Sequence, residues 1–342
     1  MDRKQYRGVD EFRMAAAFMV VAIHIAPLSI VSDRLDFLIT YCAFRVAVPF
    51  FFMVTGYFVI GPCMADNGRH TAGVRKYYRK SIFLYLGATL LFLPVNIYSG
   101  NFPQNLWDGL KCFFFDGTFY HLWYFPAVMI GGVLLLFVSK ISIKCAAVVS
   151  VIAYCFGVLG DSWYGLAKEI PLLNELYDKI FTISSYTRNG VFFAPLFILM
   201  GALAGKQRPS KRICKYGLIL SFLLMLAEGY ATYTWNIQKH NSMYFLLPFV
   251  MFFLFQLLLD VKGQAVKWLR GCSTWIYVLH PAIIVLLRGF AKFAGQTKWM
   301  IDNTLIEYAL VCLISLLISL ALQLLWKRGK HRCTKKAGPG LN

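Results

Sequence analysis

Two ionisable side chains interrupt the first apolar stretch of the sequence: Arg13 and His24, within residues 8–27. Eleven positions separate them, which is about three turns of an α-helix, so both would point to nearly the same face, roughly 16 Å apart along the axis. A charged side chain in hydrocarbon is costly, and it usually faces a protein interior or a water-filled cavity. The pair therefore indicates a polar site along this helix. Alternatively, Arg13 reaches the cytosolic membrane surface and His24 is an ordinary buried histidine.

Other polar groups lie inside later apolar stretches. Arg45 falls in the outer third of the second stretch, and Glu228 lies within the seventh. His280 precedes Pro281 in the ninth, where proline would free a backbone carbonyl. An ionisable side chain at such a position predicts a functional site. Structural alternatives remain open, because Arg45 could lie at the interface and Glu228 could pair with an arginine.

Two more candidate groups begin later stretches. His121 and Trp123 open the fourth, where the histidine could transfer protons or bind a ligand and the tryptophan is typical of the interfacial aromatic belt. Arg188 and Asn189 open the sixth, and together they could hold an anion or anchor the helix to lipid headgroups. By expected depth, Arg13 and His280 fall in the inner half and the other charged or histidine candidates in the outer half. This arrangement is consistent with one polar cavity approached from the cytosol, although depth does not show that the groups converge.

The composition is that of a polytopic membrane protein. The 342 residues are 58% hydrophobic and only 15% charged, whereas soluble proteins carry about a quarter charged residues. Apolar runs of about twenty residues predict an all-α helix bundle, not a β-barrel. We expect ten spans, at roughly 11–31, 40–61, 80–98, 121–138, 143–160, 188–205, 215–233, 243–260, 273–291 and 305–326.

The distribution of charge predicts the topology. Most of the 35 Lys and Arg residues lie at the two ends and in the even-numbered loops, so both termini should be cytosolic. The same regular placement argues that the net charge of +19 reflects membrane topology and not nucleic-acid binding. The nine cysteines show no metal-ligand spacing, so no metal site is expected. We expect residues 1–330 to form one transmembrane domain and residues 331–342 a basic, disordered tail.

Three segments resemble the acyltransferase 3 family of integral membrane proteins. GVDEFRMAAAFMVVAIH resembles the first-helix pattern, with Arg13 and His24 at its Arg and His positions. AVPFFFMVTGYFV resembles the second-helix pattern, with Thr55 replacing a Ser, and WIYVLHP resembles a later Tyr-x-x-His-Pro element. The resemblance implies a multi-pass protein of the inner (plasma) membrane. It also implies transfer of an acyl group, commonly acetyl, from cytosolic acyl-CoA to an extracytoplasmic acceptor such as a cell-envelope glycan.

In this family the resemblance gives His24 the role of general base or acyl carrier and Arg13 that of a contact on the donor path. Acyl-CoA, such as acetyl-CoA, would be a co-substrate, and no bound cofactor is implied. The sequence departs from the family's sugar acyltransferases because HLWYFPAV lacks the Glu of their fourth-helix element, which leaves the acceptor open.

The segments HLWYF and RNGVFFAPLFILMGALAG look closer to the membrane domain of VanT-type serine racemases, which is associated with L-serine uptake in vancomycin resistance. In those proteins a pyridoxal-phosphate racemase domain follows. The chain could therefore be an isolated membrane part, a truncated form or a stand-alone acyltransferase. The second hypothesis is a transporter of L-serine or a similar small polar solute. Glu228 and Arg188 would then meet the ammonium and carboxylate groups, and His24 would couple protons.

Overall fold

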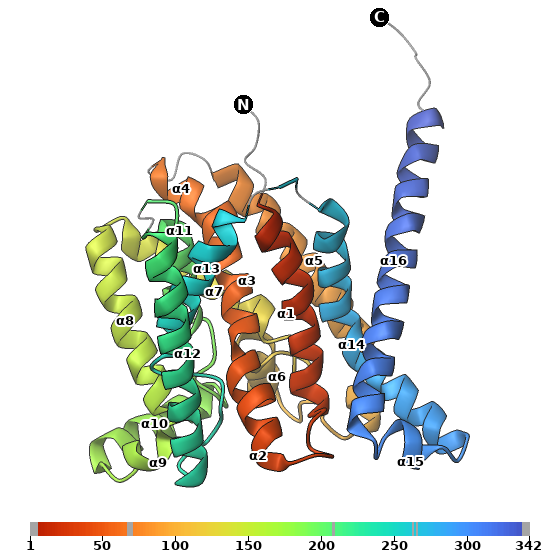
Figure 1. Cartoon of the computed structure of the whole chain (residues 1–342), viewed down its shortest axis with the longest axis horizontal. Helices are drawn as coiled ribbons and strands as arrows, with labels where there is room; N and C mark the ends of the chain where they lie inside the picture. The colour runs from red at the N-terminus through yellow and green to blue at the C-terminus, as the bar shows by residue number, and fades with distance from the viewer. Residues whose placement is uncertain (1–5, 67–70, 207–208, 262, 265, 337–342) are drawn as a thin grey trace, which may run out of the picture. The chain divides into compact units, whose positions relative to one another are not determined.

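The computed structural model is all-helical, with no strand among the residues it describes, which are 6–66, 71–206, 209–261, 263–264 and 266–336 (Figure 1). The predicted all-α fold is therefore confirmed. The chain divides into two compact units, the first made of residues 1–36 and 261–342 and the second of residues 37–260. The domain boundary expected at residue 330 stays a prediction.

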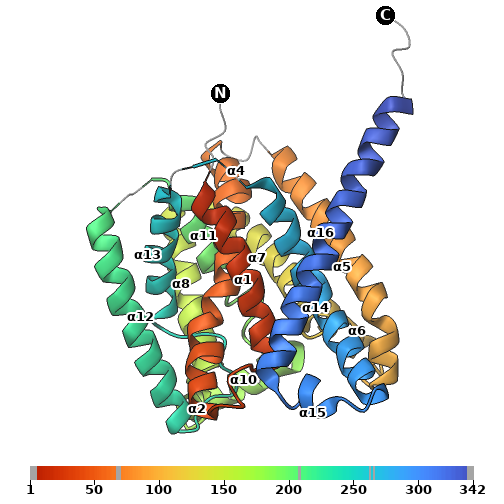
Figure 2. The same cartoon turned by 45° about the vertical axis from the view of Figure 1, so that its right-hand side comes forward.

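The first unit joins the N-terminal helix to the last long helices of the chain. Its helices α1, α14 and α16 pack against one another, and α15 links the last two (Figures 1 and 2). Their shared core holds small and branched apolar side chains, including Ala17, Val21, Ile276, Ile284 and Val311. The helix bounds are α1 Arg7–Ile25, α2 Asp33–Asp36, α14 Lys267–Phe293, α15 Thr297–Met300 and α16 Thr304–Lys336.

Helix α1 ends one residue after His24, and the end is fixed by local backbone geometry. Ala26 adopts the left-handed conformation, with φ of 59°, and its N–H bonds to the Ala22 carbonyl. Pro27 then prevents the helix from continuing. The Pro27 carbonyl accepts a hydrogen bond from Thr304 Oγ1 at 2.9 Å. His24 therefore lies in the last turn of a helix whose end is tied to the start of α16.

The second unit is built around α11, which contacts α3, α7, α8 and α13 (Figure 1). Short π- and 3-10 segments flank α3, so the chain from residue 37 to 65 is one continuous but irregular helical run. The bounds are η1 Phe37–Cys42, η2 Ala43–Val46, α3 Ala47–Thr55, η3 Gly56–Ile60, α4 Gly61–Ala65, α5 Thr71–Tyr98, α6 Leu106–Lys111, η4 Cys112–Asp116, α7 Tyr124–Ser139, α8 Ile143–Leu159, α9 Tyr164–Ala167, α10 Pro171–Ile183, α11 Ala194–Leu203, α12 Lys211–Thr234 and α13 Leu247–Asp260.

Two glycines let α11 approach the helical run of α3 and η3 at backbone contact. A Cβ at Gly201 would overlap the Met53 carbonyl, and a Cβ at Gly56 would overlap the Ile198 carbonyl. The two sites are reciprocal, since each glycine faces the backbone of the other helix. Small residues that bring backbones together are a recurrent basis of helix packing in membranes.

Substituting Gly201 should therefore destabilise the second unit. We expect Gly201→Ala to lower the free energy of unfolding by about 3 kcal/mol, because backbone atoms cannot turn aside as a side chain can. Gly87→Ala is the matched control, since a Cβ at Gly87 of α5 meets nothing within 4 Å. That control should be neutral or slightly stabilising. Thermal unfolding in detergent measures both, and equal midpoints would contradict the prediction.

Nine of the ten expected spans each overlap one helix and the second overlaps the continuous helical run of residues 37–65, but these helices differ in length. Within the described chain, five are long and apolar enough to cross a membrane: Asp33–Ala65, Thr71–Tyr98, Lys211–Thr234, Trp268–Phe293 and Thr304–Leu325. Four further apolar helices, α7, α8, α11 and α13, are shorter than the roughly twenty residues that a crossing requires, and α1, which overlaps the first expected span, belongs to neither group. The chain is therefore a membrane protein, while the number of ten crossings and the orientation of the termini stay predictions.

Several boundaries differ from the expectation. Residues 120–123 and 190–193 form turns before α7 and α11, so His121 and Arg188 lie on non-helical backbone and not in the first turn of a helix. Such backbone is tolerated in membrane proteins where it is buried in protein, and His121 is indeed buried. At the C-terminus, α16 continues to Lys336, so residues 331–336 of the expected tail are helical. Residues 337–342 lie outside the described residues.

Candidate functional site

The candidate residues divide between the two units. Arg13, His24 and His280 lie in the first unit. The second unit holds Arg45, His121, Trp123, Arg188, Asn189 and Glu228. Each unit contains a distinct polar cluster.

In the first unit, two backbone carbonyl groups determine which ring nitrogen of His280 carries the hydrogen. Its Nδ1 lies 3.0 Å from the Ile276 carbonyl oxygen and 2.9 Å from that of Tyr277. Pro281 has no N–H, so the Tyr277 carbonyl, four residues earlier, lacks its usual helical donor. Because a carbonyl can only accept, Nδ1 must carry a hydrogen, and in the neutral ring the lone pair is then on Nε2. The carbonyl that Pro281 leaves without a helical donor, as expected, thus orients the His280 ring.

His24 stacks on His280. The ring centroids are 5.3 Å apart and the planes are inclined by 25°. The expectation that His24 lies in the outer half and His280 in the inner half is therefore wrong. Helix α14 begins at Lys267, six residues before the expected start, which moves His280 further from the basic end of its helix. The tertiary structure creates a histidine pair, formed by α1 and α14, that the sequence analysis kept apart.

A second polar group of the first unit surrounds Asp10, which is 1% exposed. Arg270 forms a bidentate pair with it, Nε to Oδ1 at 2.7 Å and Nη2 to Oδ2 at 2.9 Å. Arg13 Nε lies 3.8 Å from Asp10 Oδ1, and the N–H of Val266 donates to Oδ2 at 3.2 Å. One buried carboxylate therefore holds two guanidinium groups near the N-terminal ends of α1 and α14. Guanidinium groups suit phosphate oxygens, so this end of the unit can bind an anion.

In the second unit, two arginines are held among aromatic rings and amides. Arg45 is 8% exposed, donates to Asn241 Oδ1 and lies 5.5 Å from the ring centre of Tyr41. The Arg188 guanidinium lies 4.5 Å from the ring centre of Tyr186 and 5.3 Å from that of Trp123. Cation–π contacts of this kind keep a guanidinium in place without neutralising it. The structure therefore brings Trp123 and Arg188 together, as their candidate roles require.

Asp161 supplies a carboxylate to this cluster. Its Oδ1 accepts hydrogen bonds from the N–H groups of Ser242, at 2.7 Å, and Met243, at 3.0 Å. Its Oδ2 is buried and has no hydrogen-bond partner within the described part of the chain, although His240 Nδ1 lies 3.6 Å away. Both arginines act electrostatically on Asp161. The cluster thus presents a buried carboxylate oxygen beside two guanidinium groups, an arrangement suited to a ligand that carries both an amine and a carboxylate.

The sequence predicts that the Glu228 carboxylate binds the ammonium group of a ligand, but both of its oxygens already accept hydrogen bonds from the protein. Its Oε1 accepts from Trp163 Nε1 and from the N–H of Phe245, both at 2.8 Å, and its Oε2 accepts from the N–H of Leu246 at 3.0 Å. Glu228 thereby fixes the chain that leads into α13. Its role as a ligand contact stays a prediction, and the geometry favours a structural role.

Asn189 and His121 also have local structural partners. Asn189 Oδ1 accepts from the N–H groups of Val191 and Phe192, and its Nδ2 donates to the Tyr186 carbonyl at 3.0 Å. It therefore orders the loop that carries Arg188. His121 is 1% exposed and meets the ring of Phe92 edge-on, with centroids 5.2 Å apart. The expected ligand-binding roles of both residues stay predictions.

Sequence reasoning missed Asp161 and His240. Asp161 falls in the segment between the fifth and sixth expected spans, and neither it nor His240 interrupts an expected apolar span. One signal was present, because Asp161 directly follows the apolar run of α8 with no basic residue in the same segment, GVLGDSWYG. Nothing in the sequence marks His240, whose importance comes only from its position beside Asp161.

The buried side chains of Asp161 and His240 predict opposing effects of pH on the free energy of unfolding. Burial raises the pKa of Asp161 from 3.8 to about 6, so its contribution is present at low pH and is lost as the pH rises through 6. Burial, with Arg188 and Arg45 nearby, lowers the pKa of His240 below 6.5, so its contribution is lost as the pH falls below 6.5. Between pH 4 and 6 these trends oppose each other.

Single substitutions should separate the two trends. For Asp161→Asn we expect stability to rise with pH between 4 and 6, and for His240→Gln we expect it to fall, each by up to about 1.4 kcal/mol per pH unit. Unfolding midpoints of the wild type and both variants, measured at half-unit pH steps, check this. Three parallel pH profiles would show that neither group titrates differently in the folded state.

Comparison with known proteins identifies the family. The model of the acyltransferase 3 family, an acyltransferase domain, matches residues 6–324. The chain belongs to the acyltransferase 3 family. It is a membrane protein whose matched region is an acyltransferase domain, and the predicted resemblance is confirmed. Arg13, His24 and the His280-Pro281 step all lie inside the matched region.

Three curated relatives match at 35–39% identity. An amino-acid racemase of Enterococcus faecalis is 39% identical over 340 residues, which is 97% of this chain and 48% of the relative. A serine/alanine racemase of Enterococcus gallinarum is 37% identical over 332 residues, 95% of this chain and 46% of the relative. The chain thus spans about half the length of the curated relatives it matches. No solved structure matches it.

Proposed function

We propose that this protein transfers an acyl group, acetyl in the simplest case, from acyl-CoA to a hydroxyl group of an acceptor. The observation that carries the proposal is the stacked pair of His24 and His280 within an acyltransferase domain. His24 takes the proton of the acceptor hydroxyl while its oxygen attacks the thioester carbonyl. The carbon–sulfur bond then breaks, and the leaving thiolate receives the proton. His280 orients the His24 ring through the stack.

Acyl-CoA, the acyl donor, binds at the end of the first unit where Arg13 and Arg270 lie. Arg13 and Arg270, both held by Asp10, bind phosphate oxygens of CoA. Arg270 is a partner that the sequence analysis did not name, and its side chain is 44% exposed. This exposure supports a role in capturing a ligand from solution. The proposal includes ten crossings of the plasma membrane with both termini cytosolic, which the placement of the basic residues supports.

The proposed acceptor is a cell-envelope glycan or a small polar molecule on the extracytoplasmic side. A hydroxyl acceptor is consistent with a histidine base, because a neutral imidazole has the basicity to assist its deprotonation during attack. The proposal needs no metal and no bound cofactor, and acyl-CoA is the co-substrate.

Uptake of L-serine or a similar amino acid is the second candidate function. Two observations favour it: the curated relatives are named amino-acid and serine/alanine racemases, and the second unit presents Asp161 beside Arg45 and Arg188. In this function Asp161 binds the ammonium group and an arginine binds the carboxylate. A racemase domain acting on the imported serine would be the partner.

One vesicle experiment distinguishes the two functions. Inside-out vesicles containing the chain receive acetyl-CoA labelled in the acetyl group. Right-side-out vesicles, whose outer surface is the extracytoplasmic face, receive labelled L-serine. Acyl transfer predicts label on a lumenal acceptor only when the chain is present. Retention of serine label without acetyl transfer would overturn the first proposal in favour of transport. Vesicles without the chain give the background for both labels.

A further inference from the structure

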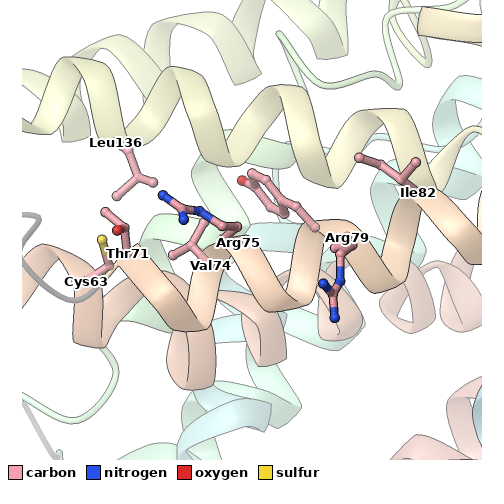
Figure 3. A pocket seen from close by; sticks show the side chains of 8 residues that line it. Cys63, Thr71, Val74, Arg75, Arg79, Ile82 and Leu136 are labelled. Atoms are coloured by element: carbon pink, nitrogen blue, oxygen red, sulfur yellow. The ribbon is translucent and has the colours of Figure 1, made fainter.

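A groove of about 470 Å³ lies in the second unit, and none of the residues found to line it belongs to the cluster of Arg45, Arg188 and Asp161 (Figure 3). It is lined by the first turns of α5, by Cys63 of α4 and by Leu136 of α7. The α5 residues that line it include Val74, Tyr78 and Ile82, which follow one another at four-residue spacing and so share a face of the helix. Its volume is within the roughly 300–1,000 Å³ typical of ligand sites.

The groove is apolar although a tyrosine lines it, because the hydroxyl of Tyr78 points into the protein and not into the groove. Tyr78 donates from its hydroxyl to the Met129 carbonyl at 3.3 Å. Gly132 makes this possible, since a Cβ at that position would overlap the Tyr78 hydroxyl. The ring carbons of Tyr78 therefore line the groove together with Val74 and Leu136. A surface of this kind suits a hydrocarbon chain.

Positive charge lies at the same end of α5. Arg75 and Arg79 line the groove one helical turn apart, and both are exposed. Figure 3 shows the Arg75 guanidinium over the groove, on the side of Leu136. Among the described residues that line the groove none is acidic, although Asp66 acts electrostatically on Cys63. The site thus combines an apolar groove with the Arg75 guanidinium, which is suited to a phosphate, while Figure 3 shows the Arg79 guanidinium pointing away from Leu136.

The neighbouring surfaces expose large apolar side chains, as surfaces in contact with hydrocarbon do. Beyond the basic turn, α5 exposes Phe83, at 68%, and Leu90, at 69%, while α7 exposes Phe137, at 68%. The run from Thr71 to Tyr98 is one of the helices able to cross a membrane. The groove therefore lies at the start of such a helix, where headgroups and acyl chains meet.

We propose that this groove binds an anionic phospholipid. One acyl chain lies against Val74, Tyr78 and Leu136, the headgroup phosphate contacts Arg75, and Arg79 adds a second positive charge one helical turn away. Charge complementarity together with the apolar lining selects this occupant over a zwitterionic lipid and over a free phosphate. The inference is independent of the proposed acyl transfer, which uses residues of the first unit.

The test uses the full chain in detergent and a phosphatidylglycerol that carries a photoactivatable group in one acyl chain. Cross-links should map to peptides containing Val74–Ile82 or Leu136. Native mass spectrometry then gives the affinity for dioleoyl phosphatidylglycerol. We expect Arg75→Gln with Arg79→Gln to weaken binding by about 25-fold, about fivefold for each arginine. Leu136→Trp, which fills the groove, should reduce both binding and cross-linking.

The matched control is Lys76→Gln with Lys80→Gln, which removes the same charge from the same turns of α5 without changing a lining residue. All variants must keep the wild-type unfolding midpoint without added lipid. Equal losses in the two double variants would overturn the proposal in favour of general surface attraction. Equal affinity for phosphatidylcholine, or for a short-chain phosphatidylglycerol, would also overturn it. Displacement by palmitoyl-CoA at lower concentrations than by phosphatidylglycerol would assign the groove to an acyl donor instead.

Discussion

Replacing His24 with asparagine is expected to lower kcat for acyl transfer by about 10²–10⁴-fold, the usual contribution of a general base. Asparagine keeps a polar side chain of similar reach but cannot accept the hydroxyl proton. Because His24 acts on the bond-making step, the KM for acyl-CoA should change little. His280→Asn should give a smaller loss, since His280 only orients its partner through the 5.3 Å stack. The measurement is the rate of label transfer from acetyl-CoA in vesicles.

Two controls accompany this measurement. Phe18→Leu is a conservative change elsewhere on α1 and should leave kcat within a few-fold of the wild type. A single-turnover experiment without acceptor tests whether His24 is instead the acyl carrier. Labelled protein in the wild type that is absent in His24→Asn would indicate a carrier. Wild-type kcat in a folded His24→Asn protein would remove His24 from the mechanism altogether.

The second large effect is expected on stability. Asp10→Ala should lower the free energy of unfolding by about 2–3 kcal/mol, less than for a fully buried ion pair, because the Arg270 side chain is 44% exposed and water screens its charge. Asp10 is 1% exposed. Its carboxylate accepts hydrogen bonds from Nε and Nη2 of Arg270 and from the N–H of Val266. Removing the carboxylate leaves two guanidinium groups and one N–H without their acceptor. Equilibrium unfolding in a mixed-detergent titration measures the change.

The neighbouring acid provides the matched control. Glu11 pairs with Arg7 at 2.6 Å, but both side chains are about half exposed, at 46% and 53%. Glu11→Gln should therefore cost at most about 1 kcal/mol, as exposed ion pairs usually do. If Asp10→Ala costs no more than Glu11→Gln, the carboxylate does not organise the end of the first unit. Asp10→Ala should also raise the KM for acyl-CoA if Arg13 and Arg270 bind the donor.

These predictions combine residues that the sequence marks with partners that it does not. Arg13 and His24 stand out because both interrupt one apolar helix, and the family match supports the significance of that spacing. Asp10 and Arg270 do not stand out, because each is a charged residue near an expected cytosolic end. Only contact between α1 and α14 shows that they form a bidentate pair.

The sequence by itself determined the helical class, the membrane character and the family. It also located the His280-Pro281 step, whose freed carbonyl holds Nδ1 of the histidine. Those features depend on hydrophobicity and on hydrogen bonds within a few residues, which local sequence encodes. The tertiary structure alone decided that His24 stacks on His280, that Glu228 accepts hydrogen bonds from the N–H groups of Phe245 and Leu246, and that Asp161 accepts those of Ser242 and Met243. Those contacts join residues far apart in the chain, so they depend on how each helix is rotated and where it ends. A periodic apolar pattern does not specify either quantity closely enough.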